Sequence, residues 1–267
     1  MRAWVLGAAL AATACGSPEA AERESKAQAP PTAFDGALVH DAAAKRAHGE
    51  RLSRVLGCRG CHTATLEGQD FYGVPASNLT REIRKYDDAQ FHRLMREGVR
   101  LDGRELWLMP SEIFQHLGDE DMAALIAHLR TLAPSGPPTP PLPPFDDEVR
   151  KLIAEGKVKP AAVLVEETRS ATPVDLGPGH ALGRYITMVT CAECHGTRLE
   201  GGENPDLVVA SAYSREEFEQ LLTKGIPNGP RKLDLMALVA KGRFAHMTRH
   251  ERDAVYAYLK ARAERPQ

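Results

Sequence analysis

Two short segments of this chain combine a pair of cysteines with a histidine. The residues are Cys58, Cys61 and His62 in the first segment and Cys191, Cys194 and His195 in the second. The spacing Cys-x-x-Cys-His is the attachment sequence of covalently bound c-type haem. Two thiols on one helical turn can form thioethers with the haem vinyl groups, and the imidazole that follows can bind the iron. A four-cysteine zinc site would need no following histidine, and a thioredoxin-like redox centre would occur once, near a strand-helix-strand pattern. The pattern therefore predicts two haems c.

The two motifs belong to an internal repeat. Cys191 follows Cys58 by 133 positions, and the same interval pairs Leu66-Glu67-Gly68 with Leu199-Glu200-Gly201. Further matches, at intervals of 127 and 130 positions, are Phe91 with Phe218, Arg104 with Arg231, Met109 with Met236, Phe114 with Phe244 and His116 with His246. A duplication of this extent predicts two modules, each built around one haem.

The recurring methionines, Met109 and Met236, are candidates for the sixth iron ligand. Each is expected in a loop before the last helix of its module, 47 positions after His62 and 41 after His195. A thioether favours ferrous iron, so a His/Met pair raises the reduction potential and suits an electron carrier. The first methionine is followed by a proline and the second by Ala237.

Two further pairs recur close to these methionines. His116 and His246 are the competing sixth ligands, and packing or capping of a helix is their other role. Arg104 and Arg231 each precede the methionine by five positions; a guanidinium there can bind a haem propionate through paired hydrogen bonds, or lie solvated in its loop. The remaining histidines have no partner in the repeat and are expected at the surface: His40, His48, His92, His128, His180 and His250.

The elements that position these residues are expected to be helices. Apolar residues recur at helical spacing, with capping and breaking residues at the ends. The predicted helices cover residues 42–56, 87–97 and 119–132 in the first module, 183–190, 215–224 and 249–263 in the second, and 149–155 between them. No segment of either module alternates as a strand does. Modules of this size cannot bury a large core without the porphyrin.

The start of the chain is expected to be a signal peptide, residues 1–14, with Ala12-Thr13-Ala14 as the cleavage signal. Its apolar run is too short to span a bilayer, which takes about 20 residues. Cys15 follows directly and is predicted to be lipidated, or else left as a free thiol by ordinary cleavage. Residues 15–36 are predicted to form a disordered tether. Covalent attachment of haem in bacteria takes place outside the cytoplasm, which also favours export.

Between the modules lies a proline-rich segment, residues 134–144, predicted to form extended polyproline II at about 3.1 Å per residue. We therefore divide the chain into a first domain at residues 37–133, a linker and crossover at 134–176 and a second domain at 177–265. The apolar run 161–165 needs cover, so the linker is expected to pack across both modules. The net charge of −2 gives no case for nucleic-acid binding.

Together these residues resemble the class I cytochrome c family. The resemblance lies in the haem motif and in the segments Asn78-Leu79-Thr80, Asp102-Gly103-Arg104, Met109-Pro110, Phe114 and Leu117-Gly118-Asp119-Glu120-Asp121. The tandem arrangement is similar to the multihaem cytochrome c subunits of membrane-associated bacterial alcohol and sugar-acid dehydrogenases. It implies an all-α fold of two tandem class I cytochrome c domains joined by the proline-rich linker.

The expected function is that of an exported dihaem carrier, anchored by lipid to a bacterial membrane and facing the periplasm. It would pass single electrons between redox partners, such as a dehydrogenase or a terminal oxidase, and would need no catalytic side chain. The alternative is a dihaem enzyme of the cytochrome c peroxidase or thiosulfate dehydrogenase kind, in which one haem has an open or exchangeable site. That enzyme would need two unlike haems.

Overall fold

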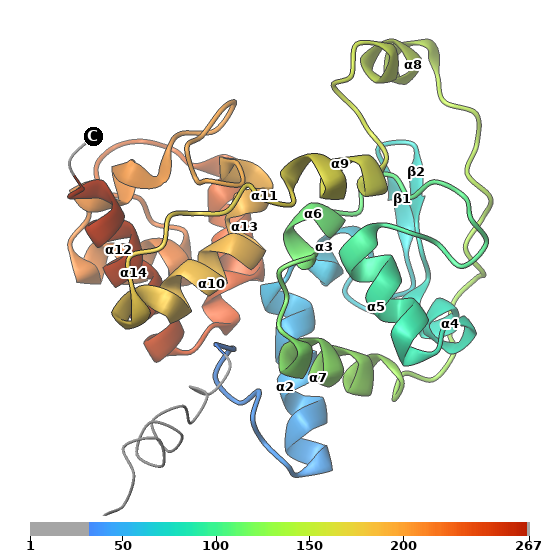
Figure 1. The fold of residues 1–267 in the computed structure, drawn as a ribbon, viewed down its shortest axis with the longest axis horizontal. Coiled ribbons are helices and arrows are strands. Elements are labelled where there is room, and N and C mark those ends of the chain that lie inside the picture. Colours follow the sequence, from blue (N-terminus) through green and yellow to red (C-terminus); the bar gives the residue numbers. More distant parts are fainter. Residues whose placement is uncertain (1–31, 266–267) are drawn as a thin grey trace, which may run out of the picture. The chain divides into compact units, whose positions relative to one another are not determined.

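The chain folds as helices joined by loops (Figure 1). The computed structural model describes residues 32–265; the predicted signal peptide, Cys15 and the predicted tether as far as residue 31 lie outside the described residues. About 54% of the described residues are helical, so the all-α prediction is confirmed. The α-helices are α2 (Ala42–Val55), α3 (Cys58–Cys61), α4 (Leu79–Glu82), α5 (Asp88–Glu97), α6 (Ser111–Phe114), α7 (Asp119–Leu129), α8 (Asp147–Ala154), α9 (Ala161–Thr168), α10 (Ala181–Thr190), α11 (Ala192–His195), α12 (Arg215–Lys224), α13 (Asp234–Gly242) and α14 (Arg249–Ala263). The 3₁₀ helices are η1 (Ile83–Lys85), η2 (Pro178–His180), η3 (Leu207–Ala212) and η4 (Phe244–His246).

The same close helix crossing is built twice, α2 against α7 and α10 against α14. A glycine lies at each crossing. A Cβ atom on Gly49 would lie 1.9 Å from the carbonyl oxygen of Ala124, and one on Gly183 would lie 2.1 Å from that of Ala254. Since no real Cβ comes so near, both crossings need glycine. The repeat seen in the sequence is therefore also a repeat of tertiary packing.

Within residues 32–265, one short antiparallel hairpin interrupts the helices, and the sequence pattern did not predict it. Strands β1 (Gln69–Phe71) and β2 (Val74–Ala76) pair through a two-residue turn at Tyr72 and Gly73. Both turn residues have positive φ, 53° and 76°, as in the tight turns that join twisted strands. With three residues each, the strands are too short to show an alternating pattern.

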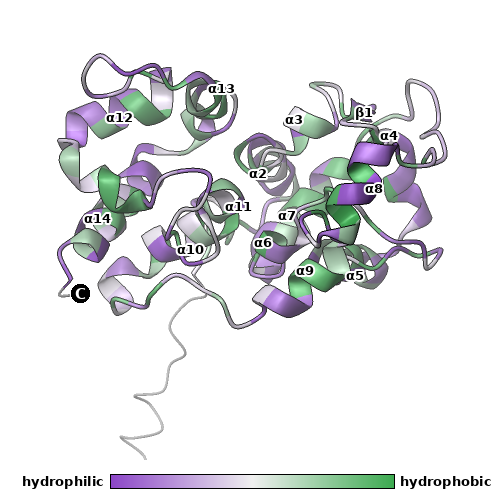
Figure 2. Ribbon diagram, turned by 90° about the horizontal axis from the view of Figure 1, so that it is seen from above, coloured by the Kyte–Doolittle hydropathy of each residue, from purple (hydrophilic) through white to green (hydrophobic). Residues whose placement is uncertain are grey.

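The segment between the modules packs on both of them, as expected. In α9 the side chains of Ala161 and Val165 are buried, and the helix lies beside α5 and α6 (Figure 2). Farther along, Arg184 donates a hydrogen bond of 2.7 Å to the carbonyl of Pro173. The proline-rich stretch is not one continuous polyproline II helix, because Gly136 has a φ of +64°, far from the required value of about −75°.

Reciprocal polar contacts join the two modules. Arg51 of α2 pairs with Glu251 of α14 through bonds of 2.7 and 2.8 Å. In the opposite direction, Tyr185 of α10 donates a 2.7 Å hydrogen bond to Asp121 of α7. Both carboxylates are fully buried. Tyr185 follows Arg51 by 134 positions, as Gly183 follows Gly49, so equivalent sites of the repeat contact each other across the junction.

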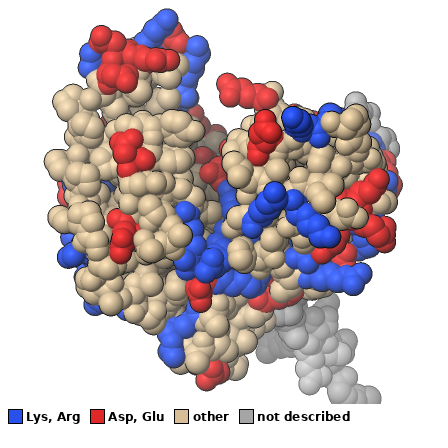
Figure 3. Space-filling view, turned by 180° about the vertical axis from the view of Figure 1, so that it is seen from behind, with Lys and Arg blue, Asp and Glu red and all other residues tan. Residues whose placement is uncertain are grey.

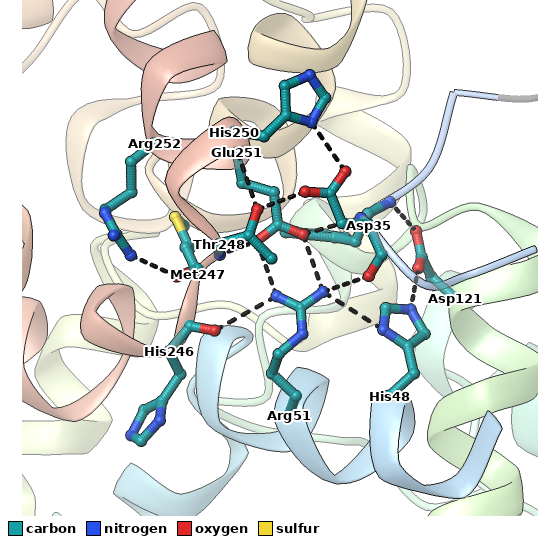
Figure 4. A network of polar contacts seen from close by, with 11 residues as sticks. Asp35, His48, Arg51, Asp121, His246, Met247, Thr248, His250, Glu251 and Arg252 are labelled. Atoms are coloured by element: carbon teal, nitrogen blue, oxygen red, sulfur yellow. Dashed lines mark hydrogen bonds and ion pairs between the residues drawn. The ribbon is translucent and has the colours of Figure 1, made fainter. Parts of the chain in front are cut away.

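The chain just before α2 completes this junction. Phe34 is buried with its ring edge-on to Tyr185, at 5.6 Å between centroids. Its backbone N–H donates to Asp121, and that of Asp35 donates to Glu251 (Figure 4). The predicted tether extended to residue 36, whereas these two residues are packed into the fold. The sequence did contain one indication of this packing, because Phe34 is a large aromatic residue in an otherwise polar segment.

Candidate haem sites

The first haem motif lies on the short helix α3, directly after α2. Gly57 joins the two helices in a left-handed conformation, with a φ of 83°. Cys58 and Cys61 are half-buried, and His62 is 8% exposed. Burial lowers the pKa of His62 and so favours its neutral form, the form in which an imidazole binds a metal.

The orientation of the histidine is fixed by the backbone in both modules. The Nδ1 atom of His62 lies 2.7 Å from the carbonyl oxygen of Ser77, and that of His195 lies 2.8 Å from the carbonyl oxygen of Pro205. A carbonyl only accepts, so Nδ1 carries the proton and Nε2 keeps its lone pair for a metal. This arrangement orients metal-binding histidines and makes them more basic.

The loop after each motif repeats the same turn. Leu66 and Leu199 are both buried and both have a φ of 64°. Behind them, Gly68 N–H donates to the carbonyl of His62 at 3.0 Å, and Gly201 N–H donates to that of His195 at 2.8 Å. A left-handed leucine costs roughly 1–2 kcal/mol. Its presence at both sites shows that the same strained turn closes the loop that holds each histidine.

A cavity of about 530 Å³ opens beside the first motif. Cys58, Cys61 and His62 line it together with Met109. The other lining residues are largely apolar and include Tyr86, Phe91, Leu94, Met95, Leu125 and Leu129. Cofactor pockets commonly measure roughly 300–1,000 Å³ and are mostly apolar. The cavity therefore fits a haem held by two thioethers, with a histidine and a methionine as its iron ligands.

The second methionine lies in a different local structure from the first. Met109 is in a loop, as predicted, whereas Met236 lies on helix α13, half-buried against the core. The prediction of a loop was wrong for Met236. Ala237 donates its N–H to the carbonyl of Leu233 at 2.7 Å. Pro110, at the matching position of the first module, has no N–H to donate, so the helix there starts only after the methionine.

The two recurring arginines differ in their surroundings. Arg104 lines the first cavity but is exposed, and it pairs with Asp102 at 2.7 and 2.9 Å. These hydrogen bonds hold the pKa of Asp102 well below its usual range. Arg231 is exposed in the loop before α13. Binding of a propionate by Arg104 would compete with Asp102, and the role predicted for both arginines stays a prediction.

The recurring histidines lie at the edges of the modules. His116 is half-buried and is not among the residues that line the first cavity, and burial together with the charge of Arg184 lowers its pKa. The ring of His246 points away from the junction network, while its carbonyl accepts a bond from Arg51 (Figure 4). Two histidines expected at the surface are buried instead: His48, bonded to a buried carboxylate, and His128. The buried carboxylate of Asp121 needs hydrogen-bond donors, and His48 is one of them. The repeat pattern could not reveal this contact.

The proline-rich segment forms part of the first cavity wall, which the sequence analysis missed. Thr139, Pro140, Pro141 and Leu142 line the cavity. Asn78 holds the segment there, because its side-chain amide donates to the carbonyls of Ser135 and Pro137, each at 2.8 Å. In the sequence, Asn78 stands out only as part of a family motif. Its structural role depends on contacts between residues almost 60 positions apart.

Two protein-family profiles match separate parts of the chain. The profile described as "Cytochrome c" matches residues 47–133. The profile described as "Cytochrome C oxidase, cbb3-type, subunit III" matches residues 180–259. Each match contains one Cys-x-x-Cys-His motif with its methionine. The exact domain boundaries stay a prediction.

Several curated proteins are similar to this chain. The fructose dehydrogenase cytochrome subunit of Gluconobacter japonicus is 28% identical over 190 residues, which is 64% of this chain and 38% of that protein. The alcohol dehydrogenase (quinone) cytochrome c subunit of Gluconacetobacter polyoxogenes is 34% identical over 95 residues, 30% of this chain and 20% of that protein. A subunit of the nicotinate dehydrogenase of Pseudomonas putida is 28% identical over 186 residues, 60% and 15% of the two chains. The matched regions span less than two fifths of these relatives.

Proposed function

We propose that this chain, which is built from two haem-binding cytochrome c domains, carries two covalently attached haems c and passes single electrons between redox proteins. The observation that carries the proposal is the repeated histidine geometry. In both modules a backbone carbonyl holds the proton on Nδ1 and leaves Nε2 to bind iron. Neither site needs a proton donor or a nucleophile for this function.

Different residues of the first module would attach the haem and ligate its iron. Cys58 and Cys61 would bind it covalently, and His62 and Met109 would ligate its iron, which supplies one-electron exchange. The largely apolar cavity wall would limit the access of water to the group, which raises the reduction potential of a haem. In the second module Cys191, Cys194, His195 and Met236 would take the same roles.

The partners follow from the relatives. The similar proteins are named as cytochrome subunits of fructose and alcohol dehydrogenases and as a subunit of nicotinate dehydrogenase, which supports a dehydrogenase as electron donor. Figure 3 shows Lys and Arg side chains gathered near the middle of one face, and such a group steers an acidic partner. No helix within residues 32–265 is long and apolar enough to cross a membrane. Export and a lipid on Cys15 would bring the chain to the membrane surface.

Absorption spectra of the purified protein test the proposal, with and without carbon monoxide. We expect two covalent haems per chain by the pyridine haemochrome assay, a methionine-to-iron charge-transfer band, and no reaction of the reduced protein with carbon monoxide. Met109→Ala and Met236→Ala should each open one iron to carbon monoxide while both haems stay attached. A mass increase on Cys15 would test the lipid anchor.

The unlike settings of the two methionines favour one alternative, a dihaem enzyme with an exchangeable ligand in the second module. Met236 lies on α13 and not in a loop. If the unaltered protein binds carbon monoxide at one haem, and Met236→Ala does not increase that binding, the second haem is open and the carrier proposal fails.

A further inference from the structure

Arg243 lies at the point where the two haem motifs meet. It ends α13, donating its backbone N–H to Val239 at 2.8 Å. Its guanidinium Nε donates to the carbonyl of Val55 at 3.1 Å, three residues before the first motif. Its Nη1 donates to the carboxylate of Glu193 at 2.7 Å, inside the second motif. One side chain thus bonds to the backbone shortly before one motif and to the middle of the other.

The surroundings of Arg243 are shaped for this approach. Gly57, directly before the first motif, would place a Cβ 2.7 Å from the guanidinium carbon of Arg243. Glu193, the ion-pair partner of Arg243, belongs to the second module but lines the cavity of the first. The side chain of Arg243 is only 13% exposed. The side chain of Glu193 is 31% exposed, so the ion pair is partly buried and is screened less than a pair at the open surface.

The charge of Arg243 lies close to both motifs. Its guanidinium bonds to Val55, three residues before Cys58, and to Glu193, between Cys191 and Cys194. It also donates to the carbonyl of Thr190, directly before the second motif, at 3.5 Å. The four cysteines of the motifs are the points at which the two haems would be attached.

Nothing in the module fold itself requires an arginine here. Phe244 pairs with Phe114 in the repeat, so Arg243 corresponds to Ile113, which is buried in the first module. The arginine is therefore specific to the second copy. Its partners lie on the junction and at the motifs.

From this geometry we infer that Arg243 is a positioning residue that holds the two haem motifs together and places one positive charge beside both haems. The inference rests on the proposed function, since it needs a haem at each motif. A positive charge disfavours ferric iron, which carries one charge more than ferrous iron. Arg243 therefore raises the reduction potentials of both haems together, and Glu193 offsets part of that effect.

The test is a redox titration followed by absorption, on the full holoprotein and its variants. Arg243→Gln should lower both midpoint potentials, Arg243→Lys should retain part of the effect, and Glu193→Gln should raise both potentials. Arg249→Gln is the matched control, because that side chain is 83% exposed and its nearest carboxylate is 3.9 Å away. It should leave both potentials unchanged.

The outcomes separate this inference from the proposed function. If the variants carry two haems but Arg243→Gln moves only one potential or neither, the inference is wrong and the carrier proposal stands. If the unaltered protein carries fewer than two haems, the proposed function itself fails. Should Arg243→Gln not assemble, Glu193→Gln alone decides: a rise of both potentials supports a shared ion pair, and a rise of one or none overturns it.

Discussion

Replacement of Arg51 by methionine should weaken the junction between the modules. The change removes a cation from Glu251, whose carboxylate is fully buried and accepts bonds of 2.7 and 2.8 Å from Arg51. Leaving a buried charge without its partner costs about 3–5 kcal/mol. The backbone N–H groups of Asp35 and Thr248 still donate to the carboxylate, so we expect the lower end, about 3 kcal/mol. For a protein of this size that lowers the melting temperature by about 6–12 °C.

Thermal unfolding of the holoprotein, followed by circular dichroism, measures the effect. Arg54→Met is the matched control on the same helix: its pair with Glu50 is 3.2 Å long, and both side chains are more than a third exposed. Such pairs contribute about 0–1 kcal/mol. The double variant Arg51→Met/Glu251→Gln should recover part of the loss, because it also removes the buried charge. Equal effects of Arg51→Met and Arg54→Met would refute the reasoning.

Three further predictions concern packing, pH and the cavity wall. Gly49→Ala and Gly183→Ala should each destabilise the protein by about 1–3 kcal/mol, because a methyl group would overlap a backbone carbonyl. Burial raises the pKa of Glu112 from 4.5 to about 7, so the folded state binds its proton more tightly than the unfolded state, and stability should fall by at most about 3 kcal/mol as pH rises from 4.5 to 7. Asn78→Ala removes the amide that donates to the carbonyls of Ser135 and Pro137, while Thr80 still donates to Ser135. The change should cost about 0.5–1.5 kcal/mol and make residues 134–144 easier to cleave.

Each of these predictions has its own measurement. Gly242→Ala is the control for the helix crossings, since nothing lies within 4 Å of its added methyl group; if it destabilises as much as Gly49→Ala, close packing is not the reason. Unfolding at several pH values should show a flatter profile for Glu112→Gln than for the unaltered protein, and identical profiles would contradict the assignment. Limited proteolysis with mass spectrometry follows the proline-rich segment, and an unchanged cleavage rate in Asn78→Ala would show that other contacts hold it.

Helices with strong end signals could be predicted from the sequence. Helices α12 and α14 have the predicted bounds, and each begins with a capping box, formed by Ser214 with Glu217 and by Thr248 with Glu251. Such signals act within one turn and need no information from elsewhere in the chain. The haem motifs are local in the same way. Their spacing therefore indicates which cysteines could attach a haem and which histidines could ligate its iron.

Features that depend on distant contacts were missed. The burial of His48 requires Asp121, 73 positions away, and the cavity wall formed by residues 139–142 requires Asn78 to hold the proline-rich segment. The loop predicted around Met236 failed for a different reason. The residue after the methionine is alanine in the second module and proline in the first. This difference decides whether the helix begins before the methionine. The prediction followed the close match between the two modules and gave that one residue too little weight.

The reciprocal contacts at the junction resemble those of a symmetric interface between two separate proteins. Here one chain supplies both sides of the interface. Two free modules would meet at a rate set by their concentration, and their pairing would be lost on dilution. Joined by residues 134–176, each module faces the other at an effective concentration fixed by the length of the linker. The haem motifs of this chain therefore stay paired however few copies the cell contains.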